Sequence, residues 1–105
     1  DNYIFSILIG NNKTIKHLII LNSFINEVDF YMYCNELIDN TTLETVKLSY
    51  DDNIVNSELI INIIMNNKSL KTFILSNNVD DISLLQKITS YTTIEKITIN
   101  DVVVK

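Results

Sequence analysis

Apolar residues recur along this chain in four short segments that share one spacing. The segments are "TIKHLII", "TLETVKL", "SLKTFIL" and "TIEKITI", each with Ser or Thr followed by apolar residues at the first, fourth and sixth positions of a frame. The first positions of the four frames are Ile15, Leu43, Leu70 and Ile94. The frames therefore recur every 24 to 28 residues or so, a period typical of repeat architectures.

Two periodicities alternate within each repeat. The frames end in apolar and polar residues that alternate with period two and include many β-branched side chains, which predicts short strands within residues 15–21, 43–49, 70–76 and 94–100. Between the frames, apolar residues are spaced by three and four, as in amphipathic helices. Helical core positions ten and six residues before each frame are Phe5, Tyr33, Ile60 and Leu84, and Ile9, Leu37, Ile64 and Ile88.

The starts of three predicted helices carry polar residues that favour N-terminal caps. These residues are Asn26, Ser57 and the pair Asp80 and Asp81. A strand and a helix of this length cannot bury an apolar face alone. We therefore expect the units to stack, with one parallel sheet and with helices on its other side.

One frame resembles the leucine-rich repeat, whose pattern is L-x-x-L-x-L-x-x-N/C. Leu70, Phe73, Leu75 and Asn78 match it closely. In such repeats the Asn-like position bonds neighbouring backbone along the stack, so Asn78 is expected to do so here.

The other units match that Asn position less well. Asp51 occupies it in the preceding unit, Ser23 approximates it in the first, and Val102 departs from it in the last. The resemblance covers nearly the whole chain. It implies a single α/β domain over residues 1–105, a ribonuclease-inhibitor-like horseshoe segment of about four repeats, with a parallel sheet on the concave side and helices on the convex side.

A doubly wound α/β sheet is the alternative architecture. It would place helices on both faces and bury both sides of each strand. The strand positions between the predicted core residues are largely polar, and the chain has a single glycine, Gly10, without a glycine-rich phosphate loop. The in-phase repeat favours the open solenoid.

The predicted binding surface is the sheet face that points away from the helices. The third and fifth frame positions should form two rows across it: His17, Thr45, Thr72 and Lys96, then Ile19, Lys47, Ile74 and Thr98. This mixture of apolar and basic residues suits a protein or peptide partner. We therefore expect a non-catalytic protein-interaction module without a cofactor, and the use of the repeat family implies the same role.

Two other arrangements, one catalytic and one metal-binding, are alternatives to this interpretation. Cys34 and His17 are a nucleophile and base in type, but the frame places Cys34 on a helix and His17 on the opposite sheet face. We expect Cys34 to be a buried structural residue and His17 a surface contact. Residues with side-chain oxygens follow the predicted strands: Asp51, Asp52, Asn53, Asn77, Asn78, Asp80, Asp81 and Asp101. They could together hold a hard cation such as calcium. We expect them instead to cap helices and to form hydrogen bonds with the backbone.

Composition removes several partner classes. A net charge of −5 without Arg argues against a nucleic-acid phosphate backbone as partner. The longest apolar runs are shorter than the roughly 20 residues of a membrane span. The single cysteine cannot form an internal disulfide, which favours a reducing, cytoplasmic location. The absence of Ala, Arg, Pro and Trp beside abundant Ile and Asn indicates an AT-rich genome, such as that of a large DNA virus or a protist.

Self-association is the alternative function. The chain starts without Met, which suggests a segment of a longer protein, and solenoid ends expose strand edges and apolar residues unless they are capped. Homo-oligomers through these ends would use Tyr3, Ile4 and Phe5, or Val102, Val103 and Val104.

Overall fold

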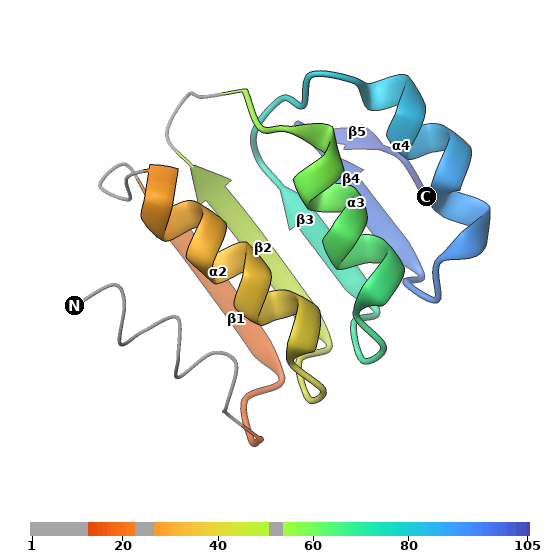
Figure 1. Cartoon of the computed structure of the whole chain (residues 1–105). Helices are drawn as coiled ribbons and strands as arrows, with labels where there is room; N and C mark the ends of the chain where they lie inside the picture. Colours follow the sequence, from red (N-terminus) through yellow and green to blue (C-terminus); the bar gives the residue numbers. More distant parts are fainter. Residues whose placement is uncertain (1–12, 23–26, 51–53) are drawn as a thin grey trace.

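The chain folds as a mixed α/β structure with a five-stranded sheet (Figure 1). The computed structural model describes residues 13–22, 27–50 and 54–105. In chain order its elements are β1 (His17–Asn22), α2 (Glu27–Asp39), β2 (Thr45–Tyr50), α3 (Ser57–Asn66), β3 (Thr72–Leu75), α4 (Ile82–Ile88), a 3-10 turn (Thr89–Tyr91), β4 (Lys96–Ile99) and β5 (Val102–Val103).

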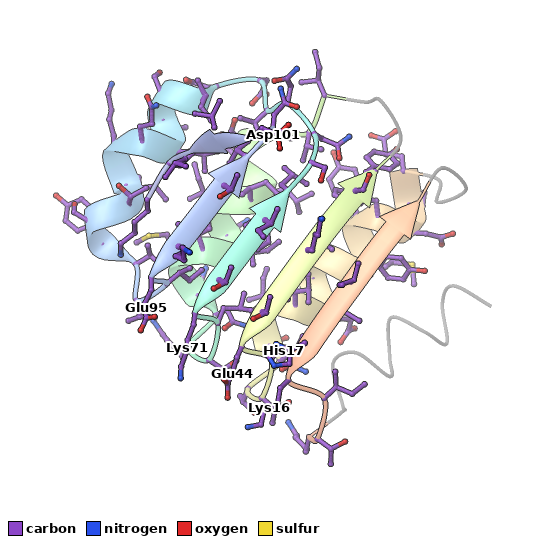
Figure 2. The ribbon with its side chains drawn as sticks, turned by 180° about the vertical axis from the view of Figure 1, so that it is seen from behind. Lys16, His17, Glu44, Lys71, Glu95 and Asp101 are labelled. Carbon is purple, nitrogen blue, oxygen red and sulfur yellow. The ribbon has the colours of Figure 1, made fainter. Side chains whose placement is uncertain are left out.

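The three helices lie together on one face of the sheet, and the opposite face carries no helix of the described residues (Figures 1 and 2). The core lies between the two layers. In the second to fourth repeats all predicted frame positions are buried, as expected: Leu43, Val46, Leu48, Leu70, Phe73, Leu75, Ile94, Ile97 and Ile99. The frames therefore identify the inward side of β2, β3 and β4.

The first repeat is less completely buried. Ile20 is in the core and Leu18 packs against it, but Ile15 is 44% exposed. Ile15 precedes β1, which pairs with β2 alone among the described strands. Among the described residues, the repeat at this edge of the sheet therefore has a neighbouring repeat on one side.

The predicted helix phase holds in α2 and α3 but not in α4. Tyr33, Leu37, Ile60 and Ile64 are buried as expected. In α4 the buried residue is Leu85, whereas the predicted core residues Leu84 and Ile88 are half-buried. The fourth repeat is the shortest, and its helix has only 7 residues before the 3-10 turn. The prediction that counts a fixed number of residues back from the strand therefore selects Leu84, one residue before the buried Leu85.

The prediction of an entirely parallel sheet is wrong at its last strand. β1 to β4 pair in parallel, but β5 runs antiparallel to β4. Asn100 and Asp101 connect them with φ angles of 48° and 64°. Positive φ at both central residues defines the two-residue type I′ hairpin, and Asn and Asp tolerate this region better than most residues. The reversal begins next to Val102, the residue that departs from the repeat pattern.

Two helix starts have well-defined caps. The Asn56 side chain accepts a 2.8 Å hydrogen bond from the Glu58 N–H, so Asn56 caps α3 and the prediction of Ser57 is wrong by one residue. Asp81 caps α4, as expected. Asn26 lies outside the described residues. No helix of residues 13–22, 27–50 and 54–105 has the length and apolar character needed to cross a membrane.

Candidate protein-binding face of the sheet

The outward side chains of the sheet form the two predicted rows. Strand pairing aligns His17 with Thr45, Thr45 with Thr72 and Thr72 with Lys96. The second row joins Ile19, Lys47, Ile74 and Thr98 in the same way. Because neighbouring strands are about 4.8 Å apart, each row spans about 14 Å. The prediction of this arrangement is confirmed, whereas its use as a contact surface stays a prediction.

Exposure differs along the two rows. Ile19 is 63% exposed, and His17 and Lys96 are also exposed. The other five row residues are half-buried against their neighbours: Thr45, Lys47, Thr72, Ile74 and Thr98. The face therefore combines an exposed isoleucine at one edge with a partly sheltered centre.

This face has a basic character in an acidic protein. Its outward strand positions with described side chains are His17, Ile19, Thr45, Lys47, Ser49, Thr72, Ile74, Lys96, Thr98 and Val103. None of these is a carboxylate. Within the described part of the chain, the ion pairs involve Lys16 and Lys71 with Glu44, so Lys47 and Lys96 keep their charges unpaired.

A row of alternating charge borders the face where the strands begin, and the sequence analysis missed it. Figure 2 shows Lys16, Glu44, Lys71 and Glu95 along this edge. The Lys16 Nζ and Lys71 Nζ atoms lie 3.5 Å and 3.8 Å from Glu44 carboxylate oxygens. Pairs this exposed contribute about 0–1 kcal/mol each. The sequence carried the signal, because all four residues occupy the second frame position.

Buried asparagine side chains hold the same edge together. The Asn67 Oδ1 atom accepts hydrogen bonds of 2.8 Å from the Ser69 and Leu70 N–H groups. Its Nδ2 donates to the carbonyls of Leu37 at 2.7 Å and Asn40 at 3.0 Å. One amide side chain thus shapes the turn into β3 and ties it to the preceding repeat.

Neighbouring repeats make related contacts, from Asn40 three residues before its frame and from Thr92 two residues before its frame. Asn40 Oδ1 accepts from the N–H groups of Thr42 and Leu43, both at 2.8 Å. In the last repeat the Thr92 hydroxyl donates to the Ile64 carbonyl at 2.7 Å. The asparagine three residues before a frame was a readable signal, shared by "NTTL" and "NKSL".

At the other edge, the bond to neighbouring backbone comes from Asn77. Its Oδ1 accepts from the Tyr50 N–H at 2.8 Å, and its Nδ2 donates to the Tyr50 carbonyl at 2.7 Å. The expected residue, Asn78, is exposed, and its Oδ1 accepts from Asn100 Nδ2 at 2.7 Å. The predicted position is therefore wrong by one residue. Asp51 and Ser23 lie outside the described residues.

Two of the acidic residues after the strands accept hydrogen bonds from backbone N–H groups, as expected. Asp80 Oδ1 accepts from the Ser57 N–H at 2.9 Å, and the hydrogen bonds from Ser57 hold the pKa of Asp80 below its ordinary value. Asp81 Oδ1 accepts from the Ser83 hydroxyl at 2.6 Å and the Leu84 N–H at 3.1 Å. The Ser83 bond is the main cause of a lowered pKa at Asp81.

The rest of the predicted acidic cluster is more scattered. Asp101 lies at the β4–β5 turn, and Asp51, Asp52 and Asn53 lie outside the described residues. Where the structure describes the chain, no group of three or more His, Cys, Asp or Glu residues is placed to hold a metal ion.

The sheet separates Cys34 from His17. Cys34 lies fully buried on α2, within the core, and burial raises the pKa of its thiol to about 12. His17 is exposed on the opposite sheet face (Figure 2). A nucleophile and a base on opposite sides of a packed sheet cannot exchange a proton directly.

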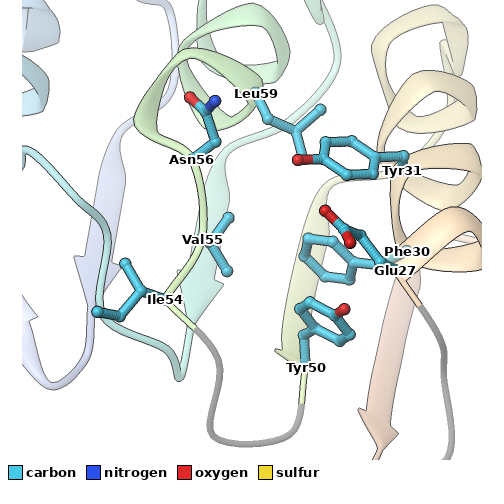
Figure 3. A pocket seen from close by; sticks show the side chains of 8 residues that line it. All are labelled: Glu27, Phe30, Tyr31, Tyr50, Ile54, Val55, Asn56 and Leu59. Atoms are coloured by element: carbon cyan, nitrogen blue, oxygen red, sulfur yellow. The ribbon is translucent and has the colours of Figure 1, made fainter.

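A shallow hollow lies between the N-terminal parts of α2 and α3 (Figure 3). The rings of Phe30 and Tyr50 stack there with centroids 4.4 Å apart. Its cavity volume of about 30 Å³ is far below the roughly 300–1,000 Å³ of small-molecule sites. Its lining is Glu27, Phe30, Tyr31, Tyr50, Ile54, Val55, Asn56 and Leu59.

Profiles of known protein families match no part of this sequence, and a search of curated proteins finds no match.

Proposed function

We propose that this chain is a leucine-rich-repeat solenoid segment that binds a protein or peptide partner through its helix-free sheet face. In this proposal that face is the concave side, the module is non-catalytic and it needs no cofactor. The observation that carries it is the pair of ordered rows on the open face, which mixes exposed isoleucine with unpaired lysine.

Repeated backbone contacts support the solenoid part of the proposal. In three successive repeats, the side chains of Asn40, Asn67 and Thr92 each accept a hydrogen bond from the backbone N–H of the first frame residue. β1 to β4 also pair in register without an insertion in any strand. Such side-by-side units, each contacting only its neighbours, are the construction principle of repeat proteins.

Surface chemistry supports the binding part. Ile19 offers exposed apolar area, Ile74 extends it towards the centre, and Lys47 lies between them in the same row. Apolar contacts supply most of the binding free energy at protein interfaces, while charges select and orient the partner. On the helix side of the sheet, by contrast, the apolar side chains are buried in the core.

The test is the double variant Lys47→Glu with Ile74→Asp. Circular dichroism and the melting temperature should change little, because neither side chain is in the buried core. The dissociation constant for a partner recovered by pull-down should rise at least tenfold, equivalent to about 1.4 kcal/mol. A matched control, Lys87→Glu with Asn62→Asp, changes exposed helix positions and should leave the dissociation constant unchanged. Retained binding in the folded sheet-face variant would contradict the proposal.

Self-association is a second candidate, because the edge strand β5 exposes two valines. Val102 is 47% and Val103 74% exposed. If this edge pairs copies of the chain, light scattering should show a mass that rises with concentration, and Val103→Lys should restore the monomer mass. A parent chain that is monomeric at high concentration would contradict this candidate. Tyr3, Ile4 and Phe5 lie outside the described residues.

A further inference from the structure

We propose that the sheet face selects an acidic peptide segment of the form acidic–x–apolar–x–acidic in extended conformation. This inference rests on the proposed function and names the chemistry of its partner. It follows from the sign of the charge on the face and from the spacing of the two unpaired lysines.

The charge on the face opposes that of the whole chain. The protein carries a formal charge of −5, yet its described outward strand positions include Lys47 and Lys96 and no carboxylate. The border row adds no net formal charge, because Lys16 and Lys71 alternate with Glu44 and Glu95. A local positive field within an acidic surface attracts anionic groups to the face and repels cationic ones.

The positions of the two lysines define the spacing of the partner's charges. Lys47 is on β2 and Lys96 on β4, so they are two strands apart, or about 9.6 Å. Lys96 shares its row with Thr72 and Lys47 shares its row with Ile74, an offset of about 6.7 Å along the strands. The diagonal between the two Cα atoms is therefore about 12 Å.

An extended peptide matches this diagonal. At about 3.3 Å per residue, side chains i and i+4 point the same way about 13 Å apart, with side chain i+2 midway between them. Carboxylates at i and i+4 can therefore pair with Lys47 and Lys96. An apolar residue at i+2 then lies over β3, where Ile74 and Thr72 occupy the centre of the face.

Nucleic acid is the other polyanion that a basic face can attract. Single-stranded nucleic acid needs stacking platforms and several cations along its backbone. The described outward strand positions contain no Phe, Tyr or Trp side chain and only two lysines. An acidic peptide with an apolar anchor uses both isoleucine and lysine, so it fits the face better.

The probe is a nine-residue peptide of Gly and Ser with Glu at its third and seventh positions and Leu at its fifth. Titrated into isotope-labelled protein, it should shift the amide resonances of Lys47, Ile74 and Lys96 with a dissociation constant of the order of 1 mM. An isomer with its two Glu residues adjacent should bind at least about fivefold more weakly, and a Lys-for-Glu peptide should not bind.

Variants test the two lysines. Lys47→Gln with Lys96→Gln should weaken binding of the first peptide at least about tenfold, and the control Lys87→Gln should not. Equal binding by the isomer or by the double variant would overturn the inference, as would no saturable shift up to about 5 mM. Preferential binding of an oligothymidylate would overturn it in favour of nucleic acid.

The inference and the proposed function can fail separately. A natural partner whose binding is lost in Lys47→Glu with Ile74→Asp, but kept in Lys47→Gln with Lys96→Gln, would overturn the acidic-peptide inference alone. A partner that binds both double variants with the dissociation constant of the parent would overturn the proposal that the sheet face is the binding site.

Discussion

Asn67 is a buried amide, 1% exposed, that uses both its oxygen and its nitrogen within the turn before β3. Asn67→Ala would remove the acceptor of two N–H groups in that turn and a donor to two carbonyls of the preceding repeat. Each buried polar group that loses its partner costs about 1–3 kcal/mol, and partial relaxation reduces the sum. We expect the free energy of unfolding to fall by about 2–4 kcal/mol, measured by urea denaturation.

The neighbouring asparagine provides the control. Asn66 is exposed at the end of α3, where its side chain bonds only the Asn62 carbonyl. Asn66→Ala should change the free energy of unfolding by less than about 0.5 kcal/mol. Equal losses in the two variants would show that the buried hydrogen bonds of Asn67 do not stabilise the turn.

Phe73 is the largest fully buried side chain of the central repeat, with no exposed surface. Phe73→Ala removes its burial and leaves a cavity between β3 and the helices, a change that costs about 3–5 kcal/mol. In a chain of this size we expect unfolding or aggregation at room temperature. Calorimetry provides the measurement, and a melting temperature within a few degrees of the parent would refute the core assignment.

At the scale of elements, the β4–β5 hairpin depends on its two left-handed residues. Asp101 has a φ of 64°, and glycine adopts this conformation without a steric penalty. Asp101→Gly should therefore raise the free energy of unfolding by up to about 1 kcal/mol, whereas Asp101→Val should lower it by about 1–2 kcal/mol. Thermal melts of both variants give the comparison. The opposite order would contradict the type I′ turn.

The connection between α3 and α4 predicts a response to acid. Hydrogen bonds from Ser57 lower the pKa of folded Asp80 below its ordinary 3.8. Asp80 therefore stabilises the fold fully above the unfolded-state pKa, and this contribution is lost as the pH falls through the folded-state pKa. Asp80→Asn keeps an acceptor oxygen but does not titrate. Its melting temperature should fall less than that of the parent between about pH 5 and pH 2.

Pattern alone predicted the inward residues of β2 to β4 and the alignment of neighbouring strands, because burial repeats with the frame. Two features depended on local geometry that the pattern does not contain. The antiparallel β5 follows from the φ angles of Asn100 and Asp101, although an Asn-Asp pair between apolar residues is itself a hairpin signal. The backbone bond moved to Asn77 because that side chain, and not Asn78, faces the preceding repeat.

The candidate site was predictable only in part. The two rows follow directly from strand alternation. The row that starts at His17 and ends at Lys96, and the row that starts at Ile19 and ends at Thr98, could therefore be placed from the sequence. The ion pairs could not be predicted from the sequence, because they depend on which charged side chains of neighbouring strands come within contact distance. The alternating border of Lys16, Glu44, Lys71 and Glu95 shows this difference, since only two of its contacts are within ion-pair distance.

For the whole molecule, the two faces of the sheet differ in composition and burial. The helix side holds one continuous apolar core, which includes Cys34 and the inward residues of every described strand from β1 to β4. The opposite side carries the rows of mixed apolar and basic residues. A partner that binds this side needs no rearrangement of the core, so binding and folding are expected to respond to different substitutions.

Site-specific photo-crosslinking tests the contact surface most directly. Thr72 lies near the centre of the helix-free face, on β3, and Asn62 is exposed on α3. A benzophenone amino acid at position 72 should crosslink to the partner recovered by pull-down, and the same group at position 62 should not. Crosslinks from position 62 without crosslinks from position 72, in variants with the parent's circular dichroism spectrum, would contradict the sheet face as the binding surface.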